Sequence, residues 1–280
     1  MRMIPNVIIS TSITLALTGC AFTAHESPLN SRAGTSYSSS SYNERIRYIV
    51  IHYTALNDRE SLKVLTSGEV SAHYLISEKN TCKDAQPCIY QLVPDDKRAW
   101  HSGKSEWNGR SHINDTSIGI EIVNLGFTAD MHGHKTWYPY TSEQITSLID
   151  LLKRLADKYN IPPENIIAHS DIAPLRKSDP GKLFPWKHLA DIGLGAWPDE
   201  DTVKKYLAGR SPISSGNVLI VQQALYKYGY TEMPQTGMLD ETTHKILSAF
   251  QLHFRPSNIE GFPDAETEAL ALALVEKYRS

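Results

Sequence analysis

The sequence has 280 residues, enough for one or two domains, and 41% of them are hydrophobic, so the chain can form a buried core. Its formal net charge of -3 gives no reason to expect a nucleic-acid partner. Three cysteines are too few for a scaffold held together by disulfides.

The N-terminus has the pattern of a targeting segment. Arg2 supplies a positive charge, and the apolar run Val7–Leu17 is too short to span a bilayer as a stable helix. The run ends in LTGC, which resembles the bacterial lipobox, where the cysteine is lipidated and becomes the mature N-terminus. We therefore predict a lipoprotein signal peptide over residues 1–19 and a lipid on Cys20; an ordinary signal peptide with a chance cysteine is the alternative. Residue 21 is alanine, not the aspartate that commonly retains lipoproteins in the inner membrane. The lipobox resemblance thus implies an outer-membrane anchor that faces the periplasm.

Residues 20–42 are rich in serine and have no apolar periodicity, which predicts a flexible tether. With Cys20 acylated, Cys82 and Cys88 remain as an even pair in an oxidising compartment. They flank a turn-like loop, so we predict a disulfide between them; two free thiols are the alternative.

Residues 43–197 predict a mixed α/β sheet covered by helices, because short apolar runs alternate with helical patterns. The strand Ser117–Val123 alternates, which places its isoleucines on one face and Glu121 on the other, next to a glycine. A capped helix is expected from Thr141 or Ser142 to about Tyr159, and Phe127–Tyr140 is expected to be a long surface loop. The other predicted elements are strands at Arg47–Ile51, Ser71–Ile76, Ile89–Val93 and Ile166–Ala168 and a helix at Arg59–Thr66.

The C-terminal part contains a short internal repeat. The pattern G-x-x-D-x-x-T occurs at Gly237–Thr243 and again at Gly261–Thr267, and each aspartate is a good N-cap for a helix. Together with Val218–Tyr228, these two helices predict a small all-α module over residues 216–280, after a linker over residues 198–215.

Five residues of the α/β part fit the parts of a hydrolytic zinc site, which needs about three protein ligands and one open position. His52 and His169 lie at strand ends, and Asp179 follows ten residues after His169. Glu121 can act as a general base, and Lys177 can stabilise a developing oxyanion.

Each of these residues, taken singly, also has an ordinary structural explanation. His52 can be a satisfied core histidine, Glu121 an exposed strand residue, and Lys177 with Asp179 a surface ion pair. The residues alone leave rival ligands open, namely His73, His101, His132 and His134.

Five separated segments, in order, resemble the zinc N-acetylmuramoyl-L-alanine amidases of the peptidoglycan-recognition-protein-like fold. The resemblance covers about residues 42–197, and its segments are Ile51–Thr54, Ser71–Ile76, Ala99–Gly103, Asn114–Glu121 and His169–Gly181. It implies zinc ligands at His52, His169 and Asp179, a catalytic carboxylate at Glu121 and a transition-state lysine at Lys177. It further implies substrate contacts, which fall on Tyr53, Thr54, His73 and His101.

The family resemblance implies a function in cell-wall turnover or recycling. The expected reaction is zinc-dependent hydrolysis of the amide between N-acetylmuramic acid, or its anhydro form, and L-alanine in peptidoglycan or muropeptides. We expect a monomer with a lipid-anchored membrane attachment and no nucleic-acid partner. The helical module resembles a peptidoglycan-binding three-helix module, with a supporting helical cap as the alternative. A non-catalytic peptidoglycan receptor and a zinc peptidase that cuts within the stem peptide are the rival functions.

Overall fold

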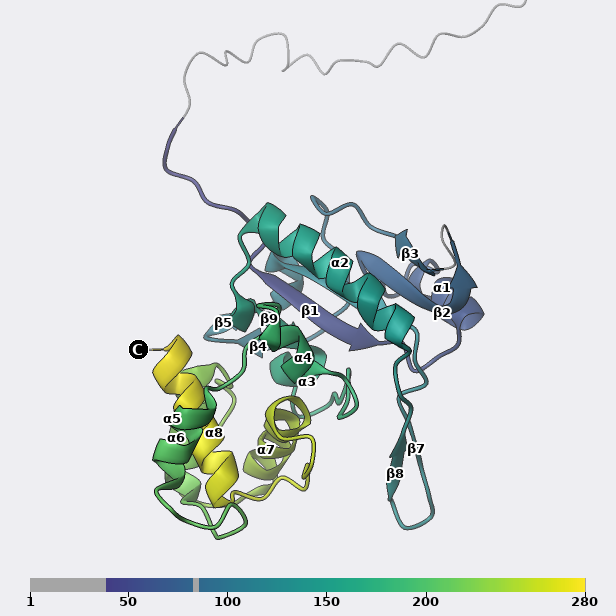
Figure 1. The fold of residues 1–280 in the computed structure, drawn as a ribbon. Coiled ribbons are helices and arrows are strands. Elements are labelled where there is room, and N and C mark those ends of the chain that lie inside the picture. Colours follow the sequence, from purple (N-terminus) through teal and green to yellow (C-terminus); the bar gives the residue numbers. More distant parts are fainter. Residues whose placement is uncertain (1–38, 83–85, 280) are drawn as a thin grey trace, which may run out of the picture. The chain divides into compact units, whose positions relative to one another are not determined.

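A five-stranded mixed sheet lies at the centre of the structure, a computed structural model that describes residues 39–82 and 86–279 (Figure 1). β1 pairs in parallel with β6 and β9, β6 pairs in parallel with β2, and β3 runs antiparallel to β2. The predicted mixed sheet is therefore confirmed. In sheet order, the strands are β3 (Pro87–Gln91), β2 (Tyr74–Thr81), β6 (Ser117–Ile122), β1 (Tyr48–Tyr53) and β9 (Ile166–Ala168).

Helix α2 (Ser142–Tyr159) covers one face of the sheet (Figure 1). It begins after Thr141, whose side chain accepts from the backbone N–H of Gln144, while the Gln144 side chain accepts from the N–H of Thr141. This capping box satisfies two backbone donors that the first helical turn leaves free. The leucines of α2 pack on the isoleucines of β1 and β6, so the predicted alternation of β6 is confirmed.

The opposite face of the sheet is covered by two groups of helices. Near β2, helix α1 (Asp58–Leu65) contributes Leu65 to a small apolar cluster with Leu75. Farther along, Val50 and Ile167 belong to the same hydrophobic core as the C-terminal helices. The α/β part and the helical module therefore share one core, and both lie in the compact unit that begins at Glu44.

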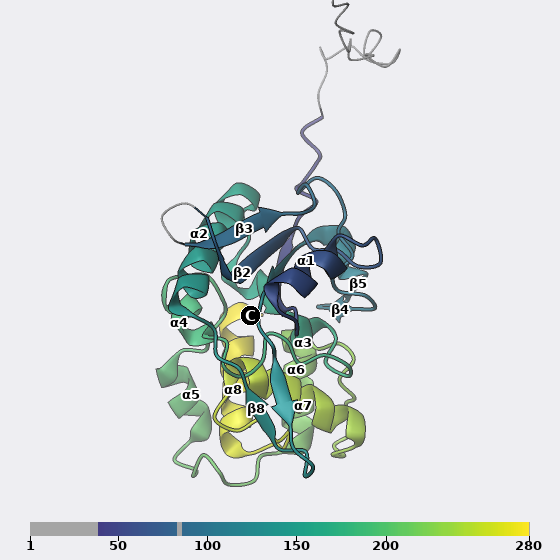
Figure 2. The same cartoon turned by 90° about the vertical axis from the view of Figure 1, so that its right-hand side faces the viewer.

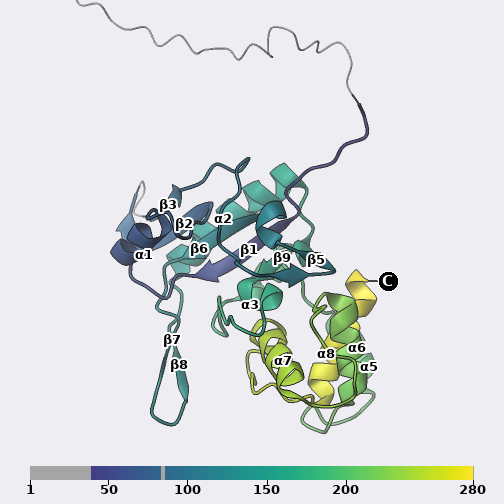
Figure 3. The same cartoon turned by 180° about the vertical axis from the view of Figure 1, so that it is seen from behind.

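The C-terminal module contains three longer helices, α6 (Val218–Tyr228), α7 (Glu241–Phe254) and α8 (Ala265–Tyr278) (Figures 1 and 3). The side chains of Asp240 and Asp264 accept from the backbone N–H groups of Thr243 and Thr267, which confirms both predicted N-caps.

A glutamine on the preceding helix holds each copy of the repeat. Gln222 on α6 donates to the carbonyl of Met238 and to Thr243 Oγ1, and it accepts from the N–H of Gly237. Gln251 on α7 makes the same three hydrogen bonds to Phe262, Thr267 and Gly261. Both glutamines are completely buried, and their side-chain amides tie each turn to the helix before it.

Residues 127–140 form a β-hairpin, not the long loop that we expected from the sequence. Strands β7 (Phe127–Ala129) and β8 (Lys135–Trp137) pair antiparallel, with Phe127 opposite Trp137 (Figure 2). The Asp130 carboxylate accepts from the N–H groups of His132 and His134 and so shapes the turn. A second short hairpin, of β4 (Glu106–Trp107) and β5 (Arg110–Ser111), lies earlier in the chain.

Residues 198–215, which we expected to be a linker, contain helix α5 (Glu200–Leu207) packed against α8 (Figure 1). Lys205 pairs with Glu276 at 2.8 Å, and Val203 packs against the shared core. This short helix buries no residue completely, so it depends on contacts with α8 that the local sequence does not reveal. Two other short helices are α3 (His169–Ile172) and α4 (Trp186–Asp191).

Cys82 and Cys88 form a disulfide, with their Cα atoms 5.0 Å apart. Residues 1–38, which include the predicted signal peptide and Cys20, lie outside the described residues. Within the described residues, no helix combines the length and the apolar character needed to cross a membrane.

Candidate active site

The candidate site residues meet where parallel strands of the sheet end. His52 lies near the end of β1 directly opposite Glu121 of β6, and His169 directly follows β9 on the other side of β1. Asp179 reaches the same place from the loop after α3. The backbone N–H of Ser170 in α3 donates to the backbone carbonyl of Asp179 at 3.0 Å, which links this loop to the helix. Strands that run parallel bring their carboxyl ends to one edge, which explains how segments far apart in sequence form one site.

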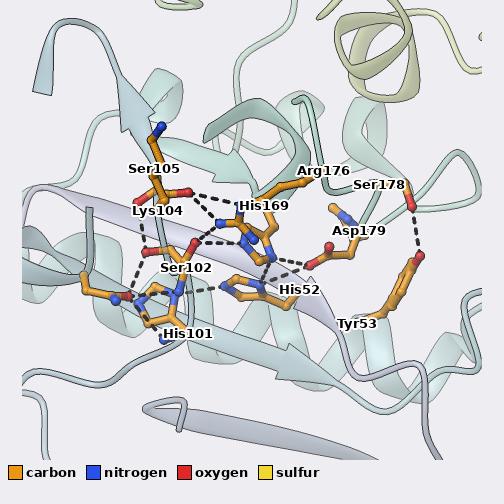
Figure 4. A network of polar contacts seen from close by, with 12 residues as sticks. His52, Tyr53, His101, Ser102, Lys104, Ser105, His169, Arg176, Ser178 and Asp179 are labelled. Carbon is orange, nitrogen blue, oxygen red and sulfur yellow. Dashed lines mark hydrogen bonds and ion pairs between the residues drawn. The ribbon is translucent and has the colours of Figure 1, made fainter. Parts of the chain in front are cut away.

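His52, His169 and Asp179 form a tight buried triangle (Figure 4). The Nδ1 atoms of the two histidines are 2.9 Å apart, and Asp179 Oδ2 lies 3.1 Å from His52 Nδ1 and 2.9 Å from His169 Nδ1. Among the residues that the structure describes, this is the one group of three or more His, Cys, Asp or Glu side chains whose ligand atoms converge in this way.

The second ring nitrogen of His169 fixes its tautomer. His169 Nε2 lies 3.2 Å from the carbonyl oxygen of Ser102, which can only accept, so Nε2 carries the proton. With Nε2 turned to the carbonyl, Nδ1 is the ring nitrogen that points at the triangle. Such a carbonyl partner behind a ligating histidine is the usual arrangement in metal sites.

A relay of hydrogen bonds fixes the tautomer of His52 in the same way. Ser117 Oγ donates to the carbonyl of Ile113 at 2.7 Å, so it accepts from His101 Nε2 at 3.1 Å. His101 Nδ1 then accepts from His52 Nε2 at 3.0 Å. Burial lowers the pKa of His52 to about 4 and that of His101 well below its usual value, so both rings are neutral near pH 7. His52 therefore presents an unprotonated Nδ1.

The triangle thus brings together three atoms that can each serve as a metal ligand. Burial raises the pKa of Asp179, but the adjacent His169 and His52 outweigh it and hold the carboxyl well below its usual range, so Asp179 is ionised. Tetrahedral zinc with ligand bonds of about 2.0 Å sets its ligand atoms about 3.3 Å apart, close to the separations seen here. The donor set therefore fits a metal ion.

Glu121 lies beside the triangle with one oxygen unused. Its Oε2 atom is buried and has no hydrogen-bond partner among the described residues. Burial, together with the negative charge of Asp179, raises the pKa of Glu121 to about 8, although Lys177 opposes the shift. A buried carboxylate with a raised pKa can accept a proton and return it near neutral pH, which is what a general acid–base group needs.

Gly119 makes room for the relay behind His52. A Cβ atom at this position would lie 2.4 Å from Cγ of His101, closer than two carbon atoms can approach. A larger residue here would displace His101 and with it the hydrogen bond that orients His52.

An open pocket of about 220 Å³ lies over the triangle. The exposed Lys177 reaches its rim, and the predicted substrate residues Tyr53 and Thr54 also line it. Tyr53 OH and Ser178 Oγ are 3.1 Å apart, which links the end of β1 to the loop that carries Asp179 (Figure 4).

The C-terminal module holds the start of this loop through Asp171. Asp171 Oδ2 accepts from the N–H of Ala168 at 2.8 Å and lies 2.7 Å from His253 Nδ1. The other carboxylate oxygen accepts from Tyr230 OH at 2.6 Å. His253 stacks on Trp186, with ring centroids 3.8 Å apart. Two module side chains therefore secure the turn from which His169 projects.

The structure corrects one predicted substrate contact and separates the rival ligands from the site. His73 is completely buried, with Nδ1 bound to the N–H of Gly119 and Nε2 to the carbonyl of Lys97, so it has no atom left for substrate. His101 lines the pocket but also orients His52. His132 and His134 lie exposed at the turn of the β7–β8 hairpin, outside the triangle.

Sequence reasoning missed the residues that act through others. Ser117, the Ser102 carbonyl and Asp171 carry no motif of their own, and their partners become visible only in three dimensions. The one available signal was Gly119, because a glycine inside a strand indicates a close approach of another group.

Three buried ligands beside a free carboxylate and an open pocket form the arrangement of a mononuclear metal hydrolase. The sequence model of the family described as N-acetylmuramoyl-L-alanine amidase matches residues 42–182, and that described as "Putative peptidoglycan binding domain" matches residues 214–270. The chain is 47% identical over 234 residues to the N-acetylmuramoyl-L-alanine amidase AmiD of Escherichia coli, with 84% of each chain covered.

Solved structures give the same result. The complex of E. coli AmiD with anhydro-N-acetylmuramic acid-L-Ala-D-gamma-Glu-L-Lys matches with a TM-score of 0.83 and 45% identity, over 87% of this chain and 94% of that one. AmpDh3 from Pseudomonas aeruginosa, in complex with an anhydromuramic pentapeptide, matches with a TM-score of 0.78 and 42% identity, over 87% and 97%. This chain belongs to the N-acetylmuramoyl-L-alanine amidase family and is an enzyme of that class.

Proposed function

We propose that this enzyme uses zinc to hydrolyse the amide between N-acetylmuramic acid, in its free or anhydro form, and L-alanine in peptidoglycan or muropeptides. The observation that carries the proposal is the buried triangle of His52 Nδ1, His169 Nδ1 and Asp179 Oδ2, next to the unpaired oxygen of Glu121. The complexes of the two similar enzymes with anhydromuramyl peptides support this substrate class.

His52, His169 and Asp179 would hold the zinc ion. When bound there, zinc supplies a Lewis acid and lowers the pKa of a coordinated water towards about 7. The hydrogen bonds of His101 and of the Ser102 carbonyl keep the two histidines in the tautomer that zinc requires.

Glu121 is the proton carrier in the proposed reaction. Its unpaired Oε2 takes a proton from the attacking water, and the protonated carboxyl then gives a proton to the departing nitrogen of L-alanine. The two transfers cancel, so Glu121 ends the cycle ionised. Lys177, at the rim of the same pocket, stabilises the negative charge that develops on the carbonyl oxygen. Tyr53, Thr54 and His101 line the pocket where the substrate would lie.

A muropeptide digest tests the proposal. The zinc-loaded protein is incubated with purified anhydromuramyl tripeptide, and the products are identified by mass spectrometry. We expect a free sugar and an intact stem with a new L-alanine amino group. Chelation should stop the reaction, and added zinc should restore it.

Two other results would overturn the proposal. Cleavage within the stem would identify a peptidase, and binding without cleavage by the zinc-loaded protein would identify a receptor. Activity that survives both chelation and Glu121→Ala would contradict the mechanism.

The proposed location is the outer membrane, with a lipid on Cys20 and a tether over residues 20–42 that lets the monomeric enzyme reach the wall from the periplasmic side. The LTGC motif supports this location. The test is membrane fractionation of the wild type and of Cys20→Ser. The variant should appear in the soluble periplasmic fraction; if both variants fractionate identically, the lipid anchor is wrong.

A further inference from the structure

A second cleft, of about 430 Å³, opens beside the active-site pocket. Its floor is the segment Pro174–Ser178, one wall is the β7–β8 hairpin, and the other is formed by α7 with Ile259. In Figures 1 and 3 the β7–β8 hairpin lies beside α7. The cleft therefore lies between the α/β part and the helical module.

The hairpin wall is fixed to the loop that carries Asp179. A Cβ atom at Gly181 would lie 2.4 Å from the ring of Trp137, so the tryptophan packs directly on the backbone two residues after Asp179. Trp137 also contacts Phe127 of the opposite strand, with ring centroids 4.9 Å apart. The hairpin is thus a supported wall rather than a free loop.

The lining of the cleft is cationic. It contains Lys135, Lys177 and Lys245 and no aspartate or glutamate, whereas the active-site pocket contains Glu121 and Asp179. The Lys135 ammonium lies 4.3 Å above the ring of Phe127. Lys245 has an acidic neighbour outside the lining, Glu241, but that carboxylate is 82% exposed, and exposed pairs of this kind are weak. Arg176 also lines the cleft, but its guanidinium is bound to the carbonyls of Ser102 and Lys104.

The cleft adjoins the active-site pocket at Lys177, which lines both cavities. A substrate chain that leaves the active-site pocket past Lys177 therefore enters the cleft. A third cavity, of about 270 Å³ on the other side of Arg176, contains Glu106 and Glu232 as well as cations, so it suits a stem that carries both an ammonium and carboxylates.

The charges that line this cleft indicate which kind of ligand it binds, because its lysines and arginine are not accompanied by any acidic residue. The muropeptide bound by E. coli AmiD contains D-gamma-Glu and L-Lys, hence free carboxylates and one side-chain ammonium. When a stem is cross-linked through that amine, the amine becomes a neutral amide and only the carboxylates remain charged. A lining of lysines without acids is complementary to such a stem.

We propose that this cleft binds a cross-linked neighbouring stem of polymeric peptidoglycan, with Lys135 and Lys245 pairing with its carboxylates. The inference rests on the proposed amidase function and assigns a subsite for a second stem of its polymeric substrate. The hairpin and α7 then act together as a polymer-binding surface beside the zinc site.

The test variant is Lys135→Ala/Lys245→Ala, because both lysines lie on the surface and neither belongs to the zinc site. The matched control is Lys153→Ala/Lys204→Ala, which removes two exposed lysines from α2 and α5. Both variants and the wild type are checked for equal melting temperature before use.

Three substrates are compared: soluble anhydromuramyl tripeptide, cross-linked sacculi, and sacculi whose cross-links have been cut by an endopeptidase. We expect the test variant to lose about five- to tenfold in rate at low concentrations of cross-linked sacculi, as two exposed ion pairs would give. It should keep its rate on the tripeptide within twofold, and its deficit should shrink on the cut sacculi. The control variant should match the wild type on all three.

Co-sedimentation of the zinc-free proteins with cross-linked sacculi tests the cleft without catalysis. The wild type should bind more tightly than the test variant, and the difference should shrink with added salt. If the test variant loses the same fraction of its rate on tripeptide and on sacculi, the cleft binds the substrate's own stem and the proposal is overturned. The proposal is also overturned if the test variant and the wild type have the same rate on cross-linked sacculi. If the wild type fails to cleave the tripeptide, the proposed function fails, whereas the sedimentation result still decides on the cleft.

Discussion

The sheet edge and the two repeat glutamines of the C-terminal module treat buried polar groups in opposite ways. In the module, Gln222 and Gln251 are fully buried, and each uses its side-chain carbonyl and its amide group to hold a turn. At the sheet edge, the Nδ1 atoms of His52 and His169 lie 2.9 Å apart and Glu121 leaves one oxygen unpaired. Satisfied buried groups stabilise a fold, and unsatisfied ones mark a place where another group binds.

This difference has a thermodynamic meaning. Removing a polar group from the module leaves its partners buried and unpaired, so stability is lost. Removing one from the sheet edge relieves an unfavourable arrangement, so function is lost while stability is kept. The four predictions below test this distinction, beginning with the largest expected effect.

Glu121→Gln should lower kcat about 10²- to 10⁴-fold, because the amide cannot carry the proton from water to the leaving nitrogen. Its melting temperature should equal or exceed that of the wild type, since no hydrogen bond of Oε2 is lost. Steady-state kinetics and thermal unfolding of the same preparations measure both quantities. If the variant is clearly less stable but remains active, Glu121 stabilises the fold rather than serving the reaction.

His253→Ala should be the most damaging change in the shared core, at about 3–5 kcal/mol, because it leaves the buried Asp171 carboxylate without one partner. Urea unfolding measures the loss. The control is His244→Ala, a histidine of the same helix that lies at the cleft rather than in the core. Equal losses for the two variants would show that Asp171 does not depend on His253.

The contribution of Glu121 to the stability of the zinc-free protein should fall, by a few kcal/mol at most, as pH rises from about 4.5 to about 8. The pKa of Glu121 is 4.5 in the unfolded chain and about 8 in the folded one, so over this window only the folded state keeps the proton. Below the window both states are protonated, and above it both are ionised. His52 acts in the opposite sense, because its pKa is lowered to about 4, so its own contribution falls as pH drops below 6.5.

The difference in stability between wild type and Glu121→Gln, followed over this pH range, isolates the carboxyl because His52 is common to both. The difference should change steadily between pH 4.5 and 8 and be flat outside it. A flat difference throughout would show that Glu121 is solvated like an ordinary surface carboxylate.

Gln222→Ala and Gln251→Ala should each cost about 1–3 kcal/mol, because each leaves a glycine N–H and a carbonyl without their partner in the module. Amidase activity on the soluble tripeptide should stay within twofold of wild type at temperatures where the variants are folded. Replacing an exposed residue of α6, as in Lys227→Ala, provides the control for Gln222→Ala. If the glutamine variants lose no more stability than that control, the turns are stable without the glutamine hydrogen bonds.

The sequence was sufficient for the elements whose pattern is local. The capping residues Thr141, Asp240 and Asp264 and the alternation of β6 were all predictable, because caps and periodicity depend on neighbours in the chain. The grouping of His52, His169 and Asp179 was predictable only through family resemblance, since nothing in the sequence shows that β1 lies between β6 and β9.

What the sequence did not reveal depends on contacts between distant residues. His73 and His101 occupy similar motifs, yet one is used up by backbone groups and the other supports His52. The hairpin over 127–137 has only three residues in each strand, too few for a visible alternation. Each repeat glutamine holds the turn that follows its own helix, a contact that the repeat motif alone did not reveal.

The contact between Asp171 and the module has a consequence for how such proteins can be recombined. The match to the amidase family ends at residue 182, and the match to the peptidoglycan-binding family begins at residue 214. These bounds alone would indicate two separable domains. Yet Tyr230 and His253 complete the environment of an aspartate only two residues from His169. A chimera that replaces this module with another wall-binding module would have to bring a hydroxyl and an imidazole to the same two places. The unit that can be inherited or exchanged here is thus larger than the unit that sequence families define.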